Sequence, residues 1–264
     1  MKQTNIGLVI PLYNEESRIS KSLKSILRYK TPSSLRLVRI VFVNDGSTDN
    51  TLEVVKSFFR KNKKLASGAK VSILSYKKNR GRGYAVKKGL LYCAGFCDYA
   101  LYADADLSMS LSNLTKVSSL IKNEYEVIIG SKKKPGAVAI PQRPLTRQIV
   151  GYFHTVFASL VLGVFVWDFQ GGLKIFSKRF VQNVVPLCKQ ERWGFDMEVV
   201  FLSTKLGYSL YELPAKWKAI EEGTTVKLFR DSRRALFDML EIRKNWPKLR
   251  VMSFNKGVGF ARSI

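Results

Sequence analysis

Strand and helix patterns alternate through the first half of this sequence, and this alternation restricts the fold more than any other feature. Short apolar runs that indicate buried strands are separated by stretches whose apolar residues recur at helical spacing. The predicted strands are 6–11, 37–43, 70–76, 99–103 and 126–130, and the predicted helices between them are 15–29, 51–59, 84–93 and 111–121. Alternation at this spacing predicts an α/β fold with a mostly parallel central sheet that helices cover on both faces.

Polar residues directly follow three of the predicted strands. Pro11-Leu12-Tyr13-Asn14-Glu15 follows the first, Asn44-Asp45-Gly46 the second and Asp104-Ala105-Asp106 the fourth. In open parallel sheets, ligands bind outside the carboxyl ends of the strands. We therefore expect these three segments to converge on one binding site at that edge of the sheet.

Asp104 and Asp106 are the strongest candidates for chemistry. Alternate side chains of an extended chain point to the same face, so the two carboxylates share one face where the fourth predicted strand ends. Carboxylates this close repel each other, but they become a favourable pair around a hard divalent cation that also holds a phosphate-bearing ligand. The alternative is a polar strand end with two solvated aspartates, because an isolated Asp-x-Asp pattern is common by chance.

The formal net charge of +25 over 264 residues predicts a polyanionic partner: nucleic acid, an anionic membrane surface or a phosphorylated substrate. The sequence contains no recognised nucleic-acid-binding motif. The three cysteines, Cys93, Cys97 and Cys188, form neither a disulfide framework nor a zinc motif and fit a reducing cytosol. The N-terminus lacks a signal-peptide pattern, and the longest apolar run, 156–167, is about half of what spans a bilayer. We therefore expect a cytoplasmic protein without a transmembrane helix.

The second half of the chain is more basic. Between Lys132 and Arg147 there are five basic residues and no acid. The following segment, 145–167, predicts a helix that lies either in the core or at a lipid interface. A glycine-containing strand over 168–176, a helix over 193–206 and a last strand over 210–217 complete the prediction.

The tail over 227–262 carries ten Lys or Arg against three Asp or Glu, and its apolar residues trace a helical stripe. A basic amphipathic helix of this kind packs on its own domain or lies on a membrane surface. The sequence therefore predicts two units, a domain over 1–227 and a basic amphipathic extension over 228–264.

Four segments in order resemble the motifs of the family 2 glycosyltransferases, which have the GT-A fold. They are Val9-Ile10-Pro11-Leu12-Tyr13-Asn14-Glu15-Glu16, Val43-Asn44-Asp45-Gly46-Ser47-Thr48-Asp49, Asn79-Arg80-Gly81-Arg82-Gly83-Tyr84-Ala85 and Asp104-Ala105-Asp106-Leu107-Ser108. Residues 168–174 and 194–198 resemble the branch that loads sugars onto polyprenyl phosphates. Residues 216–226, followed by Arg230-Asp231-Ser232, are most similar to dolichyl-phosphate β-glucosyltransferases, with Gly-Thr-Thr at 223–225 where those enzymes have Gly-Ser-Lys.

The resemblance implies an inverting, metal-dependent transferase that moves a sugar, expected to be glucose from UDP-glucose, onto a polyprenyl or dolichyl phosphate. It implies that the protein works peripherally on the cytoplasmic face of a membrane. Within the same family, the alternatives are GDP-mannose as the donor and a soluble transferase that acts on a glycan. A nucleotide-sugar binder without turnover and a nucleic-acid-binding module are alternatives of other classes.

The resemblance also assigns residues to the donor. Mg²⁺ or Mn²⁺ is expected at Asp104, Asp106 and Gln170. The nucleotide sugar is expected to contact Pro11, Tyr13, Glu15, Asp45, Arg80, Gly81, Gly83, Asp104 and Gln170.

The expected acceptor determines the roles of the remaining residues. A phosphate monoester has its second pKa at about 6, so a lipid phosphate is already an oxyanion at neutral pH and needs no general base. The catalytic set is therefore expected to be Asp104 and Asp106 at the metal, with Asp168 and Asp196 orienting the sugar or the acceptor. The acceptor phosphate is expected to bind Lys132, Lys133, Lys134, Arg143 and Arg147, with the first isoprene units against the apolar segment that follows.

Overall fold

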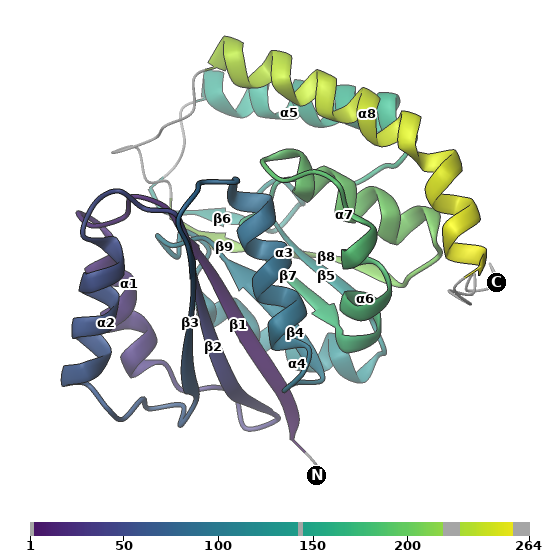
Figure 1. Cartoon of the computed structure of the whole chain (residues 1–264). Helices are drawn as coiled ribbons and strands as arrows, with labels where there is room; N and C mark the ends of the chain where they lie inside the picture. Colours follow the sequence, from purple (N-terminus) through teal and green to yellow (C-terminus); the bar gives the residue numbers. More distant parts are fainter. Residues whose placement is uncertain (1–2, 142–144, 219–227, 256–264) are drawn as a thin grey trace.

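The computed structural model describes residues 3–141, 145–218 and 228–255, and its centre is a seven-stranded sheet (Figure 1). The strand order is β3-β2-β1-β4-β7-β5-β8, in which β7 runs antiparallel to β4 and β5 while the other neighbours are parallel. The predicted mostly parallel sheet is therefore confirmed. The strands are β1 (Thr4–Leu12), β2 (Leu35–Asp45), β3 (Lys70–Tyr76), β4 (Tyr99–Ala103), β5 (Val127–Ser131), β7 (Leu173–Ser177) and β8 (Leu210–Pro214), while β6 (Val138–Ala139) pairs with β9 (Lys216–Trp217) in a small second sheet.

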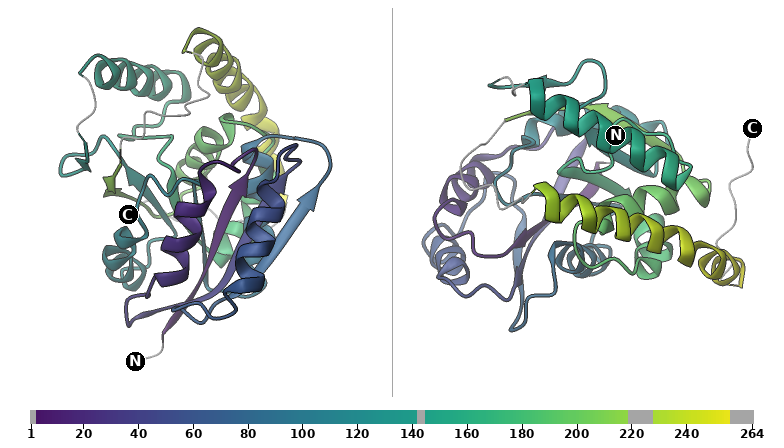
Figure 2. Two further views of the ribbon diagram at one scale, coloured as in Figure 1. Left: turned by 90° about the vertical axis from the view of Figure 1, so that its left-hand side faces the viewer. Right: turned by 90° about the horizontal axis from the view of Figure 1, so that it is seen from above.

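Helices cover both faces of the central sheet (Figures 1 and 2). Successive side chains of β1 show why: Leu8 and Ile10 lie in a buried cluster with side chains of α1, α2 and α4, whereas Val9 lies in a cluster with side chains of α3, α6 and α7. A strand buried on both faces reads as a nearly continuous apolar run, as the buried part of β1, residues 6–12, does. The helices are α1 (Ile19–Arg28), α2 (Thr51–Lys61), α3 (Arg82–Cys93), α4 (Leu114–Lys122), α5 (Leu145–Leu162), α6 (Lys178–Asn183), α7 (Gly194–Lys205) and α8 (Leu228–Asn255).

Two predicted helices extend at least four residues beyond their limits in the structure. The first is predicted from residue 15, but α1 begins at Ile19 because residues 13–18 form a turn in which Asn14 has a φ of 52°. The second is predicted to reach residue 167, but α5 ends at Leu162, and the next residue, Gly163, has a φ of 61°. A left-handed glycine directly after the last turn, as at Gly163, is a common helix end. The last predicted strand, 210–217, is divided between β8 and β9.

The strand predicted over 168–176 begins only at Leu173, and two glycines before it bring the chain close to the end of β4. A Cβ atom on Gly172 would collide with the carboxylate of Asp104, and one on Gly171 would collide with the carbonyl oxygen of Gly130 in β5. The absence of side chains at these two positions therefore lets β7 enter the sheet between β4 and β5.

The helices α5 and α8 contact each other above the carboxyl ends of the strands (Figures 1 and 2). Ala235, Met239 and Ile242 of α8 are buried in the same cluster as side chains of α7, so part of the predicted amphipathic stripe packs on the rest of the protein. Other apolar side chains of the two helices are exposed, among them Phe153 at 71% and Phe237 at 63%. Within the described ranges, no helix combines the length and the apolar character that a membrane crossing requires. Residues 256–264 of the predicted extension lie outside these ranges, and its boundary at 228 stays a prediction.

Candidate active site

Asp104 and Asp106 lie in a tight turn that directly follows β4. The carbonyl of Asp104 accepts the N–H of Leu107 at 2.9 Å, and Leu107 has a φ of 49°. Asp106 Oδ1 accepts the backbone N–H of Ser108 at 2.8 Å. Asp104 Oδ1 accepts two hydrogen bonds from Arg82, at 2.9 Å from Nε and 2.5 Å from Nη2. Both aspartates are therefore held in place through their Oδ1 atoms.

Arg82 joins Asp104 to a second carboxylate, Asp196 at the start of α7. Arg82 Nη1 donates to Asp196 Oδ2 at 2.5 Å, Lys174 Nζ donates to Asp196 Oδ1 at 2.7 Å, and the Tyr102 hydroxyl donates to the same Oδ1. The structure thus brings together two of the predicted catalytic residues, one in the turn after β4 and one in the first turn of α7.

The Asp196 carboxylate is a buried anion with several fixed donors. Asp196 is 1% exposed and Lys174 is completely buried. Burial opposes the ionisation of Asp196, but the charges of Arg82 and Lys174 more than offset this and hold its pKa below the ordinary value of 3.8. A carboxylate with a lowered pKa and occupied lone pairs is a poor general base, so this arrangement suits positioning rather than proton transfer.

Asp45, at the end of β2, anchors the glycine-rich loop that precedes α3. It is 2% exposed. Its Oδ1 accepts the N–H of Arg80 at 2.8 Å, and its Oδ2 accepts the N–H of Gly81 at 2.8 Å and the side-chain amide of Asn79 at 2.9 Å. The predicted contact between Asp45 and the nucleotide sugar stays a prediction, because here the carboxylate binds the protein's own loop.

The glycines of this loop pack against the segment before α7. A Cβ atom on Gly81, whose φ is 117°, would lie 2.6 Å from the carbonyl oxygen of Glu191, and one on Gly83 would lie 2.5 Å from Cβ of Phe195. The side chain of Arg80 pairs with the carboxylate of Glu191. Close packing within the protein therefore already explains these glycines, and their contact with the nucleotide stays a prediction.

The segment after β1 presents its side chains in different ways. Pro11 is buried, and Tyr13 is 45% exposed. Glu15 is 9% exposed and accepts a hydrogen bond from Arg18 at 2.8 Å. Burial is the main cause that raises the pKa of Glu15, and the charges of the two aspartates after β4 add to it while Arg18 opposes it. This electrostatic coupling places Glu15 in the same region as those aspartates.

Asp168 lies in the loop between α5 and β7, in a separate group of residues. It is 3% exposed. Its Oδ2 accepts the N–H of Lys132 at 2.9 Å, its Oδ1 accepts the N–H of Gln170 at 3.1 Å, and Nζ of Lys133 lies 4.0 Å from Oδ1. The Gln170 side chain is exposed. The structure therefore places Asp168 beside the predicted acceptor-phosphate segment, and its role in orienting the acceptor stays a prediction.

The three lysines of that segment extend toward three different parts of the chain. Lys133 Nζ donates to the carbonyl of Gly151 in α5 at 2.8 Å, Lys134 Nζ donates to the carbonyl of Glu212 in β8 at 2.7 Å, and Lys132 Nζ lies 5.2 Å from the ring centroid of Trp217 in β9. Arg143 and Arg147 have side chains outside the described part. The binding of a phosphate by all five residues stays a prediction.

A divalent cation fits the turn after β4 by the chemistry of its donors. Asp104 and Asp106 offer hard carboxylate oxygens, which Mg²⁺ and Mn²⁺ prefer. Among the side chains that the structure describes, no group of three or more His, Cys, Asp or Glu residues is arranged to hold a metal ion. A cation at this turn would therefore take two carboxylates and complete its coordination with ligand or water oxygens, with Gln170 as the further predicted ligand.

Lys174 and Tyr102 are the site residues that the sequence analysis did not identify. The signal for Lys174 is its position, because it is a single lysine in the apolar strand Leu173-Lys174-Ile175-Phe176. A charge on a strand that is buried on both faces needs a buried partner. That requirement could have pointed to Asp196, but only the fold shows which carboxylate supplies the partner.

The motif order, the fold and this geometry agree with what comparisons with known proteins find. The profile of Glycosyl transferase family 2 matches residues 8–184. The dolichyl-phosphate beta-glucosyltransferase of Saccharomyces cerevisiae is 30% identical over 252 residues, which cover 90% of this chain and 74% of the yeast protein. Its counterpart from Dictyostelium discoideum is 27% identical over 247 residues, covering 90% of this chain and 73% of the relative.

Solved structures show the same fold at lower identity. Glucosyl-3-phosphoglycerate synthase from Mycobacterium tuberculosis, in complex with Mn²⁺, UDP and glucosyl-3-phosphoglycerate, has a TM-score of 0.60 and 17% identity over 90% of this chain and 80% of its own. Residues 1–349 of Staphylococcus aureus TarS, in complex with UDP-GlcNAc, have a TM-score of 0.56 and 17% identity over 87% of this chain and 64% of that one. These likenesses confirm the predicted GT-A fold.

Proposed function

This chain belongs to glycosyl transferase family 2, and we propose that it transfers glucose from UDP-glucose to the phosphate of a dolichol-type polyprenyl lipid. The choice of acceptor and sugar rests on one observation, the 30% identity to a dolichyl-phosphate beta-glucosyltransferase across 90% of this chain. The site is compatible with it, because the Asp196 carboxylate is bound to Arg82 and Lys174, and the proposed nucleophile needs no base.

In the proposed reaction, an oxygen of the lipid phosphate attacks the anomeric carbon of glucose and UDP departs. The attacking phosphate is already ionised at neutral pH, so the protein's task is alignment and stabilisation of charge. In-line attack inverts the anomeric carbon from the α-linked donor to a β-linked product. Arg82 holds Asp104 on one side and Asp196 on the other, so it fixes the distance between the donor side and α7 and adds a positive charge next to the departing diphosphate.

Asp104 and Asp106 would hold a divalent cation next to that diphosphate. When bound, such a cation neutralises the negative charge that develops on the departing nucleoside diphosphate. The turn itself contributes rigidity, because the Oδ1 atoms of both aspartates are already fixed by Arg82 and by the N–H of Ser108.

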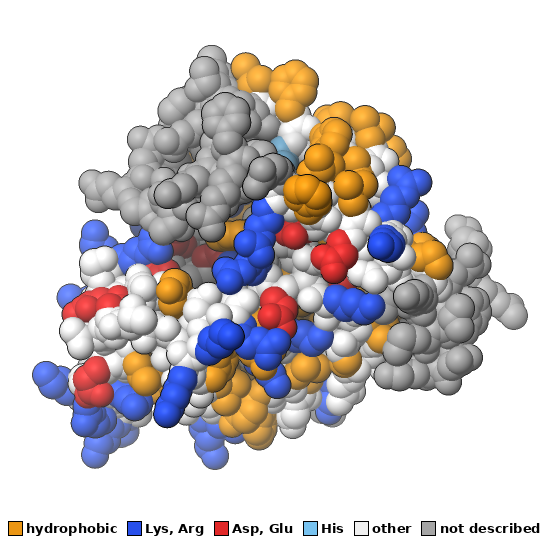
Figure 3. Space-filling model, turned by 45° about the horizontal axis from the view of Figure 1, so that its top comes forward, with side chains coloured by type: hydrophobic (Ala, Val, Ile, Leu, Met, Phe, Trp, Pro, Cys, Tyr) orange, Lys and Arg blue, Asp and Glu red, His pale blue; other side chains and the backbone are white. Residues whose placement is uncertain are grey.

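We further propose that the protein binds the cytoplasmic surface of an anionic membrane with the α5 side of the molecule. The net charge of +25 favours an anionic surface. Apolar side chains gather at the top of the surface in Figure 3, and Leu160 and Phe165 are 65% and 79% exposed. An apolar cavity of about 420 Å³ lined by Val156, Leu160, Phe165 and Trp167 is large enough for isoprene units of the acceptor.

A donor and acceptor screen on the purified protein tests the proposed function. UDP-glucose with dolichyl phosphate is expected to give a metal-dependent, lipid-linked product, whereas GDP-mannose or dephosphorylated dolichol is expected to give none. Asp106→Asn is expected to reduce turnover at least tenfold. Asp98→Asn removes a carboxylate at the opposite end of β4 and serves as the matched control. Transfer from GDP-mannose in preference to UDP-glucose, or to a soluble glycan without lipid, would contradict the proposal.

A further inference from the structure

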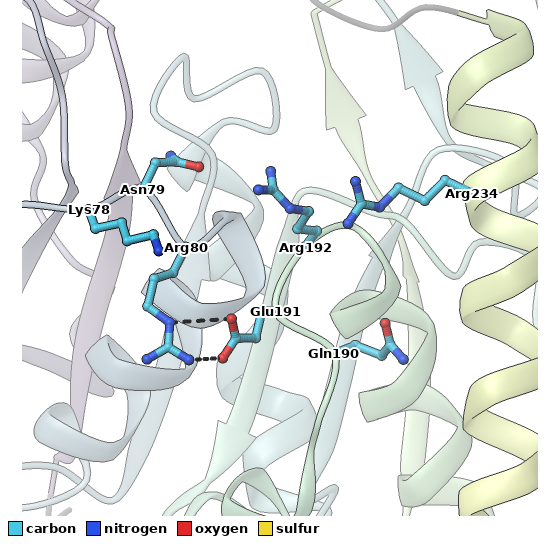
Figure 4. Close-up of a pocket in the computed structure, with 7 residues that line it drawn as sticks. All are labelled: Lys78, Asn79, Arg80, Gln190, Glu191, Arg192 and Arg234. Carbon is cyan, nitrogen blue, oxygen red and sulfur yellow. Dashed lines mark hydrogen bonds and ion pairs between the residues drawn. The ribbon is translucent and has the colours of Figure 1, made fainter.

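A cationic cavity of about 510 Å³ lies between the loop before α3, the segment before α7, and α8 (Figure 4). Four of its lining residues are basic, Lys78, Arg80, Arg192 and Arg234, and Glu191 is the acidic one. Glu191 is already paired with Arg80. The cavity therefore keeps three further positive charges that reach it from three separate elements.

The three remaining cations face the same space. In Figure 4 the guanidinium group of Arg234 extends from α8 toward Arg192, and Lys78 extends from the opposite wall. All three side chains are exposed. Two acids of α8 lie nearby: Asp238, whose charge interacts with Arg234, and Glu241, which accepts a hydrogen bond at 2.9 Å from the side-chain amide of Gln190, another lining residue. Cations that converge in a cleft focus a positive potential there, which attracts anions and opposes further cations.

We propose that this cavity binds the phosphate group of a lipid phosphomonoester, at a site separate from the carboxylates after β4. The identity of the lipid in this inference rests on the proposed function, whereas the binding of a phosphate group rests on the cavity alone. The chemistry of the two places differs, because Asp104 and Asp106 need a divalent cation before they can meet a diphosphate. The cavity offers arginines and a lysine, which bind a dianionic monoester directly, and the guanidinium fork can donate two hydrogen bonds to one phosphate.

The cavity lies one layer of side chains away from the candidate active site. Asn79 lines the cavity and also donates its side-chain amide to Asp45. Trp193, the neighbour of Arg192, has its ring centroid 5.3 Å from the guanidinium carbon of Arg82. A phosphate held here would thus be next to the residues that hold Asp104, where an acceptor has to arrive.

The surface of α8 next to the cavity favours a ligand with an apolar chain. Phe237 and Leu240 are 63% and 51% exposed and follow Arg234 at intervals of three residues along the helix. Residues at this spacing lie near one another on a helix surface. A lipid phosphate could place its charge at Arg234 and its first apolar carbons against these side chains, whereas a free phosphate would leave them exposed to water.

Direct binding of farnesyl phosphate to the full chain, without donor, tests the inference. Calorimetry measures the affinity. Arg192→Gln and Arg234→Gln are each expected to weaken binding about tenfold, since a hydrogen bond to a charged group is lost, and the double variant is expected to be weaker again. Arg36→Gln removes the same charge from an exposed position at the start of β2 and is expected to bind as the unaltered protein does.

The results of these binding experiments test the phosphate site independently of the proposed glucosyl transfer. Unchanged affinity in the double variant, with its thermal unfolding unchanged, would overturn the inference. Equal losses of affinity for UDP and for farnesyl phosphate would also overturn it, because the cavity would then belong to the donor. A protein that binds farnesyl phosphate through these arginines but glucosylates no lipid phosphate keeps the site and refutes the proposed function. Short-chain phosphatidic acid in a parallel arm identifies the source of the headgroup: tighter binding of farnesyl phosphate indicates the acceptor lipid, and tighter binding of phosphatidic acid indicates the surrounding membrane.

Discussion

Asp196→Asn should be one of the most destabilising single substitutions in this protein. The change removes the charge that faces two cations, and it leaves Lys174, which is completely buried, with the carbonyl of Gly171 as its hydrogen-bond acceptor at 2.9 Å. Removing one partner of a buried ion pair typically costs about 3–5 kcal/mol. We expect a loss of that size in the free energy of unfolding, because Asp196 is 1% exposed and solvent cannot replace it.

Urea unfolding followed by circular dichroism measures this loss. The pKa of Asp196 is lowered in the folded protein, so its contribution is complete above its ordinary pKa of 3.8 and is lost as the pH falls through the folded value. The difference between the two proteins should therefore shrink in strong acid. Glu53→Gln, which breaks the exposed pair with Arg60, is the control and should have a much smaller effect.

A second substitution tests whether the unpaired charge of Lys174 causes the loss of stability. Adding Lys174→Met to Asp196→Asn removes the unpaired buried cation, so the double variant should be more stable than Asp196→Asn alone. The account of the buried network is wrong if Asp196→Asn loses less than about 1 kcal/mol, well under the usual cost of breaking such a pair, or if the second substitution deepens the loss. Separately, a folded Asp196→Asn variant that binds donor but performs no chemical step would contradict the expectation that Asp196 is not required as a base.

Three further predictions follow from packing, burial and charge. Gly83→Ala should lower the free energy of unfolding by about 1–3 kcal/mol in the same urea assay, because its Cβ would lie 2.5 Å from Cβ of Phe195; unchanged stability would show that the 191–195 segment can move away. Burial raises the pKa of Glu198 above its ordinary 4.5. The free energy of unfolding should therefore fall as the pH rises from 4.5 through the folded pKa, and Glu198→Gln should remove this decline. Parallel pH profiles of the two proteins would contradict this prediction. Sedimentation with liposomes should show salt-sensitive binding that requires anionic lipid, and equal binding to neutral vesicles would remove the electrostatic part of the membrane proposal.

The local pattern of the chain was sufficient to predict the sheet and the edge at which the candidate site lies. The alternation of apolar runs with segments of helical spacing depends only on residues that are neighbours in sequence. For this reason the predicted strands 70–76 and 99–103 coincide with β3 and β4. The polar segments after β1, β2 and β4 were placed correctly because parallel strands deliver their carboxyl ends to one edge. The segment with glycines at 171 and 172 was predicted to be a strand, but the reversed direction of β7 depends on the strands that lie on either side of it.

Partners distant in the chain were decided only by the tertiary structure. Arg82 and Asp196 are 114 residues apart, and the pairing of Lys174 with Asp196 exists only because β7 enters the sheet next to β4. The sequence grouped Lys132, Lys133 and Lys134 as one basic run, but in the fold their ammonium groups extend to different elements. Sequence periodicity reports which face of a strand or helix is buried, whereas the partner of a buried charge depends on which elements the topology makes neighbours. That neighbourhood is a property of the folded chain and cannot be read from any one segment of it.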